Sequence, residues 1–214
     1  HGHGCLIRPM VFVPRQVLPK TGIILVLNGT SSAGKTSIAR ALQWVHTEPF
    51  HHLQLNAFRD MEPPGHWDNW KQQPAETMAL KLAALNRAMH AALAQYARHG
   101  QNVIFDTVLS TADSMHYLLE DLSDLHVLLL AVHCNVEVLA AREKTRGDRP
   151  LGLAASQVGQ VHTDKAYDLE VDTSATSANE CAMQIAAWLS QSPVVDAFTQ
   201  LRATHASPVP KPCT

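Results

Sequence analysis

The sequence predicts an α/β fold in which helices cover a five-stranded parallel sheet. Two observations carry this prediction. From residue 23 onward, short apolar runs alternate with longer segments whose apolar residues recur every three or four positions, which is typical of strands alternating with helices. The first apolar run also passes through a short glycine-rich loop directly into a helical pattern, as in a strand–loop–helix unit.

The elements follow from local patterns along the chain. The strands are expected at five apolar runs: residues 23–27, 52–55, 103–105, 126–132 and 167–171. Three successive leucines in the fourth run suit a strand that is covered on both faces. Helices are expected after Lys35, over residues 78–96, from an Asn135 N-cap to Lys144, and after a capping box formed by Ser177 and Glu180.

Length and composition predict one globular domain. The chain has 214 residues, of which 46% are hydrophobic and 17% charged, so it can bury a full core. We expect the domain to span residues 21–192. Residues 1–20 contain three prolines and no periodicity, which predicts an irregular arm, and residues 193–214 form a weakly patterned tail.

Charge and residue usage argue against several classes of protein. The formal net charge of −2 provides no basic surface for nucleic acid, and the apolar run at 127–132 is too short to cross a bilayer. The four cysteines are far apart and form no C-x-x-C pair, so we expect reduced thiols and a cytoplasmic protein. The 13 histidines show no ligand spacing that predicts a zinc site.

The most specific motif is the loop after the first strand. The eight residues from Gly29 to Thr36 read GTSSAGKT and fit the phosphate-binding pattern G-x-x-x-x-G-K-[ST] without a mismatch. Backbone N–H groups and the helix dipole would hold phosphates there, while Lys35 reaches the β/γ-phosphates and Thr36 binds Mg²⁺. The nucleotide-binding residues expected from the loop are Gly29, Ser31, Ser32, Ala33, Gly34, Lys35, Thr36 and Ser37. The alternative is a Gly/Ser turn that binds nothing.

Two further features favour a kinase over other nucleotide-binding classes. Asp106 ends an apolar strand, where a second nucleotide-binding aspartate would hold Mg²⁺; a turn or N-cap residue is the alternative. Arg142, Arg146 and Arg149 are spaced four and three apart on one helical face, suited to bidentate phosphate contacts. A solvated basic face is the alternative there. The chain has no N-K-x-D guanine signal, which weakens a GTPase interpretation.

Taken together, these motifs resemble those of the chloramphenicol phosphotransferase family. The resemblance covers residues 23–190 and rests on the loop, the strand at 103–106, the segment from Val132 to Arg149, and the sequence YDLEVDTS at 167–174. It implies a three-layer, nucleoside-kinase-like P-loop fold with an arginine-bearing lid at about 142–162. The implied reaction transfers the γ-phosphate of ATP to a hydroxyl group, with ATP and Mg²⁺ as cofactors.

One position departs from the family pattern. The family carries an aspartate as general base about twenty residues beyond the P-loop lysine, and the matching residue here is Asn56. An amide can orient a hydroxyl group but cannot accept its proton at neutral pH. Three explanations stay open: an introduced change, a native Asn with Asp60 or Asp106 as the working carboxylate, or a protein that no longer catalyses.

The region at 56–75 is expected to bind the acceptor. Its candidate substrate contacts are Asn56, Phe58, Arg59, Asp60, Trp67 and Trp70, together with Asp106. The two tryptophans would provide a flat apolar wall, or alternatively only pin a long loop to the domain. At the end of the fifth strand, Thr173 is expected near the adenine, with a plain turn as the alternative.

Three functional hypotheses follow from the sequence. The first is an ATP-dependent O-phosphotransferase acting on a hydroxylated antibiotic, with Lys35 and the three arginines neutralising the phosphoryl group and residue 56 facing the acceptor hydroxyl. The second keeps the reaction but makes the acceptor a metabolite or nucleoside. The third is a non-catalytic nucleotide-binding switch. The sequence does not fix the acceptor or the oligomeric state.

Overall fold

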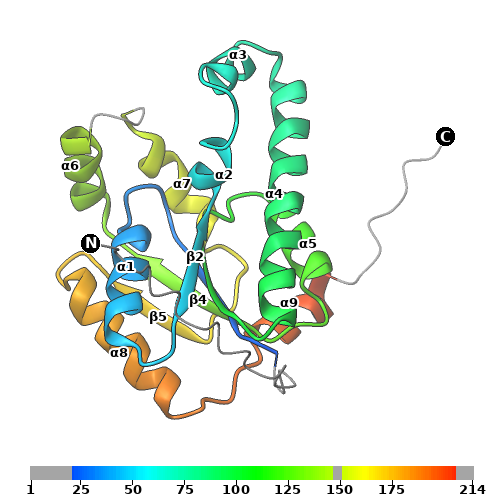
Figure 1. The fold of residues 1–214 in the computed structure, drawn as a ribbon. Coiled ribbons are helices and arrows are strands. Elements are labelled where there is room, and N and C mark those ends of the chain that lie inside the picture. The colour runs from blue at the N-terminus through cyan, green and yellow to red at the C-terminus, as the bar shows by residue number, and fades with distance from the viewer. Residues whose placement is uncertain (1–20, 147–150, 206–214) are drawn as a thin grey trace, which may run out of the picture.

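A computed structural model describes residues 21–146 and 151–205. Its five strands form one parallel sheet in the order β2-β3-β1-β4-β5 (Figure 1). The strands are β1 (Ile24–Asn28), β2 (Phe50–Gln54), β3 (Asn102–Thr107), β4 (Val127–His133) and β5 (Leu169–Asp172). All five expected strands are therefore confirmed. The predicted arm at 1–20 and the arginine at position 149 lie outside the described residues.

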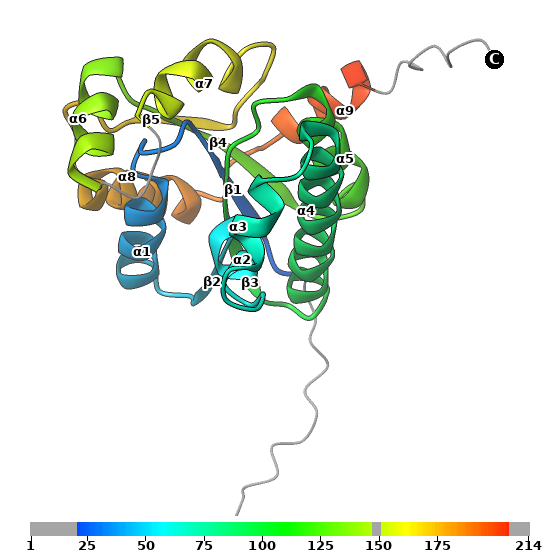
Figure 2. The ribbon, with the colours of Figure 1, turned by 90° about the horizontal axis from the view of Figure 1, so that it is seen from above.

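Helices cover both faces of the sheet and give three layers (Figure 2). One face carries α1 (Lys35–Val45) and α8 (Ala178–Ser190), and the other carries α4 (Ala75–Arg98), α5 (Ala112–Asp121) and α9 (Ala197–His205). Alternate residues of β1 contribute to the two cores, Leu25 to the first and Val26 to the second. Because side chains alternate along a strand, a central strand with both faces covered must be apolar throughout.

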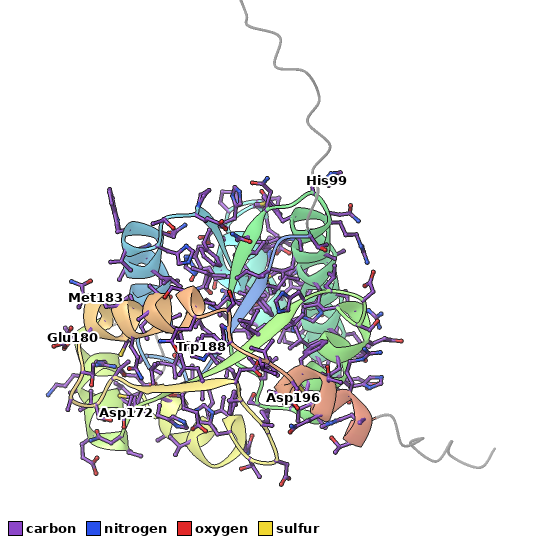
Figure 3. All side chains as sticks on the ribbon, turned by 90° about the horizontal axis from the view of Figure 1, so that it is seen from below. His99, Asp172, Glu180, Met183, Trp188 and Asp196 are labelled. Atoms are coloured by element: carbon purple, nitrogen blue, oxygen red, sulfur yellow. The ribbon has the colours of Figure 1, made fainter. Side chains whose placement is uncertain are left out.

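Helix α8 begins at the capping box and packs with the apolar side that the sequence pattern predicts. Ser177 accepts a hydrogen bond from the Glu180 backbone N–H while Glu180 caps in return, so the predicted capping box is confirmed. Figure 3 labels two residues further along the helix: Trp188 packs against the core, whereas Met183 is exposed. Asn135 likewise accepts from the Val138 N–H and begins α6 as expected.

The remaining helices are α2 (Leu55–Arg59), α3 (His66–Lys71), α6 (Val136–Arg146) and α7 (Leu153–Val161). Figure 1 shows α2 and α3 standing above the carboxyl end of the sheet on one side, with α6 and α7 on the other. The second expected strand ends one residue too late, since Leu55 already begins α2.

Part of the segment expected as a weakly patterned tail forms a helix. Residues 197–205 form α9, which contacts β4 and α5 and buries Phe198 and Leu201 in the core. A helix of nine residues with a few apolar positions gives only a short periodic signal, and its stability comes from this tertiary packing.

Candidate active site

The phosphate-binding loop lies between β1 and α1 in the centre of the sheet. Gly34 adopts φ 91° and Ser32 adopts φ 61°, so the loop turns sharply before the helix begins. At Gly29 a Cβ atom would lie 2.5 Å from the carbonyl oxygen of Val132, so only glycine fits there. Left-handed and right-handed residues in succession turn backbone N–H groups into a concave anion-binding nest.

Lys35 is buried at the first turn of α1 and held against the loop. Its Nζ atom donates to the carbonyl oxygens of Gly29 at 3.0 Å and Thr30 at 2.8 Å. The same atom lies 3.8 Å from Oδ1 of Asp106, at the end of the neighbouring strand β3. The ammonium group therefore stands between the loop carbonyls and the Asp106 carboxylate.

Asp106 is the centre of a polar cluster at the ends of β2 and β3. Its Oδ2 accepts a hydrogen bond from the Thr36 hydroxyl at 2.5 Å, and the same hydroxyl lies 3.4 Å from Oε1 of Gln54. The Nε2 atom of His52 lies 3.6 Å from Oδ2 of Asp106. The strand register explains this meeting, because Gln54 is paired with Asp106 in the β2–β3 ladder.

The charges around Asp106 decide its ionisation. Burial raises the pKa of this carboxyl, but the facing His52 imidazole, the Lys35 ammonium and the Thr36 hydroxyl together lower its pKa below the ordinary value. The group is therefore ionised at neutral pH, which a metal-binding carboxylate requires.

Arg142 lies at the other edge of the loop, against the ends of β4 and β5. Its guanidinium donates to the Ser32 carbonyl oxygen at 3.3 Å and, through both terminal nitrogens, to the hydroxyl and carbonyl oxygens of Thr173. The Thr173 hydroxyl in turn donates to the carbonyl oxygen of Ala33 at 2.8 Å. Arg142 and Thr173 therefore both lie against the loop, next to Gly34.

Helices α6 and α7 are connected to each other and to the loop by hydrogen bonds. Glu143 of α6 is buried, and its carboxylate accepts hydrogen bonds from the N–H groups of Gly152 and Ala154 at the start of α7. From α7, the Gln157 Oε1 atom accepts from the Ser31 N–H at 2.7 Å. The Gln157 side chain therefore accepts from a backbone N–H group of the loop that would otherwise be available to a phosphate oxygen. Arg146 ends α6.

The expected acceptor region forms two short helices with no buried residues. Asn56 accepts a hydrogen bond from Arg59 at 3.3 Å, and the Arg59 guanidinium lies 3.7 Å from the centroid of the Trp67 ring. Trp70 donates to His66 at 3.0 Å and faces Lys81 of α4. The two tryptophans thus have cationic neighbours.

Phe58 and Asp60 are expected at the acceptor and Ser37 at the nucleotide, but all three lie outside the contacts that join Asn56, Arg59 and Trp67. Phe58 is half-buried and packs against the core beside α4, while Asp60 and Ser37 are exposed. The region is therefore assembled around Arg59 and Trp67.

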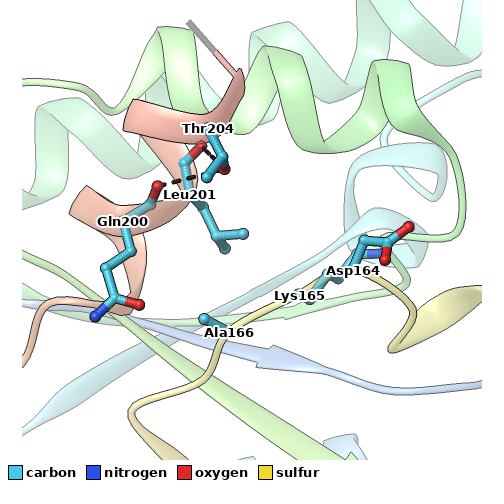
Figure 4. Close-up of a pocket in the computed structure, with 6 residues that line it drawn as sticks. All are labelled: Asp164, Lys165, Ala166, Gln200, Leu201 and Thr204. Carbon is cyan, nitrogen blue, oxygen red and sulfur yellow. Dashed lines mark hydrogen bonds between the residues drawn. The ribbon is translucent and has the colours of Figure 1, made fainter.

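Two surface hollows contain none of the expected site residues. One, of about 330 Å³, is lined by residues 164–166 and by Gln200, Leu201 and Thr204 of α9 (Figure 4). The second, of about 290 Å³, lies nearby between α5 and the end of α7. Both hollows are open surface depressions.

The sequence analysis assigns no functional role to three residues near the loop: His52, Gln54 and Gln157. Side chains alternate along a strand, so His52 and Gln54 lie on the same face of β2. This alternation is the sequence signal that could have identified them together. Gln157 had no signal, because its contact with Ser31 joins residues 126 positions apart.

Comparison with known proteins identifies the family. A family model described as chloramphenicol phosphotransferase-like protein matches residues 22–190. The chain belongs to this family. A relative in two strains of Mycobacterium tuberculosis is provisionally named an O-phosphotransferase. It is 33% identical to this chain over 198 residues, and the aligned region covers 85% of this chain and 88% of the relative.

Solved structures confirm the fold of this chloramphenicol phosphotransferase-like chain. The APS kinase of Mycobacterium tuberculosis, solved with AMPPNP and APS, covers 80% of this chain and 99% of its own, at TM-score 0.61 and 16% identity. The shikimate kinase of Acinetobacter baumannii covers 83% and 97%, at TM-score 0.58 and 14% identity. The tunicamycin resistance protein of Deinococcus radiodurans covers 79% and 96%, at TM-score 0.56 and 16% identity.

Family and fold together place the chain among the P-loop small-molecule kinases. In the segments 21–146 and 151–205, no helix has the length and apolar character needed to cross a membrane. Within the same segments, no group of three or more His, Cys, Asp or Glu side chains is arranged for a metal ion.

Proposed function

We propose that this protein is a Mg²⁺-dependent O-phosphotransferase that moves the γ-phosphoryl group of ATP to a hydroxyl group of a small antibiotic-like molecule. The observation that carries the proposal is the contact of Lys35, Thr36 and Asp106 at the mouth of the phosphate-binding loop. A charged amine, a hydroxyl and an ionised carboxylate gathered beside one loop are what a metal–triphosphate complex requires. The family and the relative named as an O-phosphotransferase support the same reaction.

The reaction forms a bond between the acceptor oxygen and the γ-phosphorus and breaks the bond from that phosphorus to the β,γ-bridging oxygen. ADP leaves with the electron pair, and the acceptor loses its hydroxyl proton to a base or to water. Lys35 would leave the Gly29 and Thr30 carbonyls and neutralise charge on the transferring group, while loop amides hold the β-phosphate. Gln157 must release the Ser31 N–H for this to happen.

The residues present fit a magnesium ion. Oγ1 of Thr36 and Oδ2 of Asp106 are 2.5 Å apart, close enough to contact one cation, and oxygen atoms are the ligands that Mg²⁺ prefers. When bound, the ion would neutralise charge on the phosphates. In this proposal Thr36 and Asp106 hold it, and Lys35 shares the electrostatic task.

We place the arginine-bearing lid at residues 142–162 and the acceptor-binding region at 56–75. Arg142 would meet the nucleotide at the Thr173 side of the loop, and Arg146 and Arg149 would help to neutralise the transferring phosphoryl group. Asn56, Arg59, Asp60 and Trp67 would meet the acceptor, with Phe58 and Trp70 supporting that surface. The cytoplasm suits such an enzyme, because ATP is present and the free thiols of Cys134 and Cys181 stay reduced there.

A kinase assay with a panel of acceptors tests this function. ATP and Mg²⁺ are supplied with chloramphenicol and other hydroxylated antibiotics in one arm, and with nucleosides and sugars in the other. Phosphorylation of an antibiotic supports the proposal, and phosphorylation of only a nucleoside or sugar moves the acceptor to metabolism. ATP binding without transfer to any acceptor, together with a nucleotide-dependent protein partner, would instead favour a non-catalytic nucleotide-binding switch. The observation that favours this alternative is Asn56, whose amide cannot act as a general base.

A further inference from the structure

A buried histidine faces the proposed metal site without a hydrogen-bond partner. The His52 side chain is only 11% exposed, and its Nε2 atom is buried with no hydrogen bond to the described residues. An unsatisfied buried nitrogen is costly, and natural proteins rarely keep one without a reason. At 3.6 Å, the separation of this atom from Oδ2 of Asp106 is too long for a hydrogen bond.

The surroundings of this nitrogen are those of a metal ligand. Oδ2 of Asp106 also contacts the Thr36 hydroxyl, and that hydroxyl lies 3.4 Å from the Gln54 amide oxygen. His52 and Thr36 thus both approach Oδ2 of Asp106, and Gln54 approaches the Thr36 hydroxyl. Metal–ligand bonds of about 2.0–2.2 Å allow two ligands of one ion to stand 3.6 Å apart, so His52 and Asp106 can share a cation.

We propose that His52 supplies an imidazole ligand to the divalent cation held by Thr36 and Asp106, which raises the affinity of the site for first-row transition-metal dications relative to Mg²⁺. Gln54 completes the site with its amide oxygen. The inference rests on the proposed function, since it concerns the metal of that same nucleotide site. Imidazole binds transition metals well, whereas Mg²⁺ prefers oxygen and keeps its water, so the nitrogen shifts preference from Mg²⁺ towards ions such as Mn²⁺.

The neighbouring histidine provides a built-in comparison. His51 also lies on β2, but its Nε2 atom is 3.1 Å from Oε1 of Gln101, and its ring packs on Tyr96 at 4.7 Å between centroids. Successive strand residues point to opposite faces of the sheet, so His51 faces α4 while His52 faces Asp106. Two adjacent imidazoles on one strand therefore differ in whether a metal can reach them.

Binding of Mn²⁺ in the presence of ADP tests the inference without relying on turnover. Free Mn²⁺ is quantified by its electron paramagnetic resonance signal for the wild-type protein, His52→Ala and the control His51→Ala. We expect His52→Ala to weaken Mn²⁺ binding by at least about tenfold, the loss usual for disturbing a metal ligand's support. The affinity for Mg²⁺, measured by competition, should fall clearly less, and His51→Ala should match the wild type.

Pulsed electron paramagnetic resonance assigns the ligand directly. Mn²⁺ bound to the wild-type protein should show a ¹⁴N coupling whose frequency changes when the protein is labelled with ¹⁵N-histidine, and which disappears in His52→Ala. If His52→Ala does not fold, His52→Gln keeps a polar group of similar size and should lower the Mn²⁺-to-Mg²⁺ affinity ratio.

The possible results separate this inference from the proposed function. Unchanged Mn²⁺ affinity and no histidine-derived coupling, in a protein that binds ADP with metal, would overturn the role of His52 alone. Loss of Mn²⁺ and Mg²⁺ affinity by equal factors in His52→Ala would make His52 a general support for Asp106 and would also overturn the selectivity. A wild-type protein that shows no nucleotide-dependent metal binding would overturn both.

Discussion

The nucleotide side and the proposed acceptor side of this molecule, helices α2 and α3, are built differently. On the nucleotide side, the loop joins a fully buried central strand to α1, and the buried side chains of Lys35 and Asp106 make polar contacts of 3.8 Å or less. On the acceptor side, α2 and α3 contain no buried residue and are held by contacts such as Arg59 on Trp67. The fold therefore holds the phosphate-binding loop in place through buried contacts, whereas the proposed acceptor surface lies on two short helices with no buried residue.

This difference explains how one architecture accommodates different acceptors. Changes to exposed residues of short helices cost little stability, whereas changes at the loop disturb buried polar groups. The acceptor surface can therefore vary while the loop stays the same. Substitutions on the two sides should accordingly have distinct signatures, the first in KM for the acceptor and the second in kcat.

The largest effect is expected for Lys35→Met. Without the ammonium group, charge on the transferring phosphoryl group is not neutralised, and we expect turnover to fall by about 10²–10³-fold. A phosphate-release or coupled ADP assay measures this. Lys165→Met is a matched control, because Lys165 also donates to two backbone carbonyl oxygens but lies outside the site, and it should retain wild-type turnover. Equal loss in both variants would contradict the assignment.

Asn56→Asp should act in the opposite direction. A carboxylate at this position can accept the hydroxyl proton, and we expect turnover on the true acceptor to rise at least about tenfold. The affinity for ATP should not change, because the substitution lies outside the loop. An unchanged or lower rate would show that residue 56 does not face the acceptor hydroxyl.

Trp67→Ala should affect only the acceptor. Loss of an aromatic contact costs about 0.5–1.5 kcal/mol, which corresponds to a rise of about 2- to 12-fold in KM for the acceptor, with KM for ATP unchanged. Trp44→Ala is the control, since that tryptophan is 89% exposed on α1. Parallel changes in both KM values would remove the distinction between the two sides.

The smallest effect concerns stability at low pH. Burial, together with the charges of His133 and Lys165, lowers the pKa of His162 at the end of α7 to about 4, from an ordinary value of 6.5. Between these values the unfolded chain binds more protons than the folded one, so stability falls as pH drops through this window.

His162→Gln removes this titration and should lose less of its melting temperature between pH 7 and pH 5 than the wild type does. His116→Gln, at an exposed histidine of α5, is the control and should follow the wild-type curve. A His162→Gln variant with the same pH profile as the wild type would show that His162 does not contribute.

The sequence predicts the nucleotide side far better than the acceptor side. The loop motif, the five strands and the two caps depend on local spacing, so they can be identified along the chain. The meeting of Asp106 with Thr36 follows from strand order, which the motif implies. In contrast, α2, α3 and α9 are short, and the positions of α2 against α4 and of α9 against α5 and β4 depend on tertiary contacts that no local pattern encodes.

The polar neighbours of Asp106 illustrate the same limit. His52 and Gln54 matter only because β2 pairs with β3 in a register that sets Gln54 opposite Asp106. Gln157 reaches Ser31 from a helix more than one hundred residues away. A one-residue shift in register would turn the β2 side chains to the other face, so these contacts emerge only in three dimensions.

The most direct test of the account is a calorimetric titration of the folded protein with Mg²⁺ and the non-hydrolysable analogue AMPPNP. The account predicts saturable binding of one nucleotide per chain with a Kd between about 1 µM and 1 mM, greatly weakened in Lys35→Met. A wild-type protein with a native circular-dichroism spectrum and no measurable binding would contradict it.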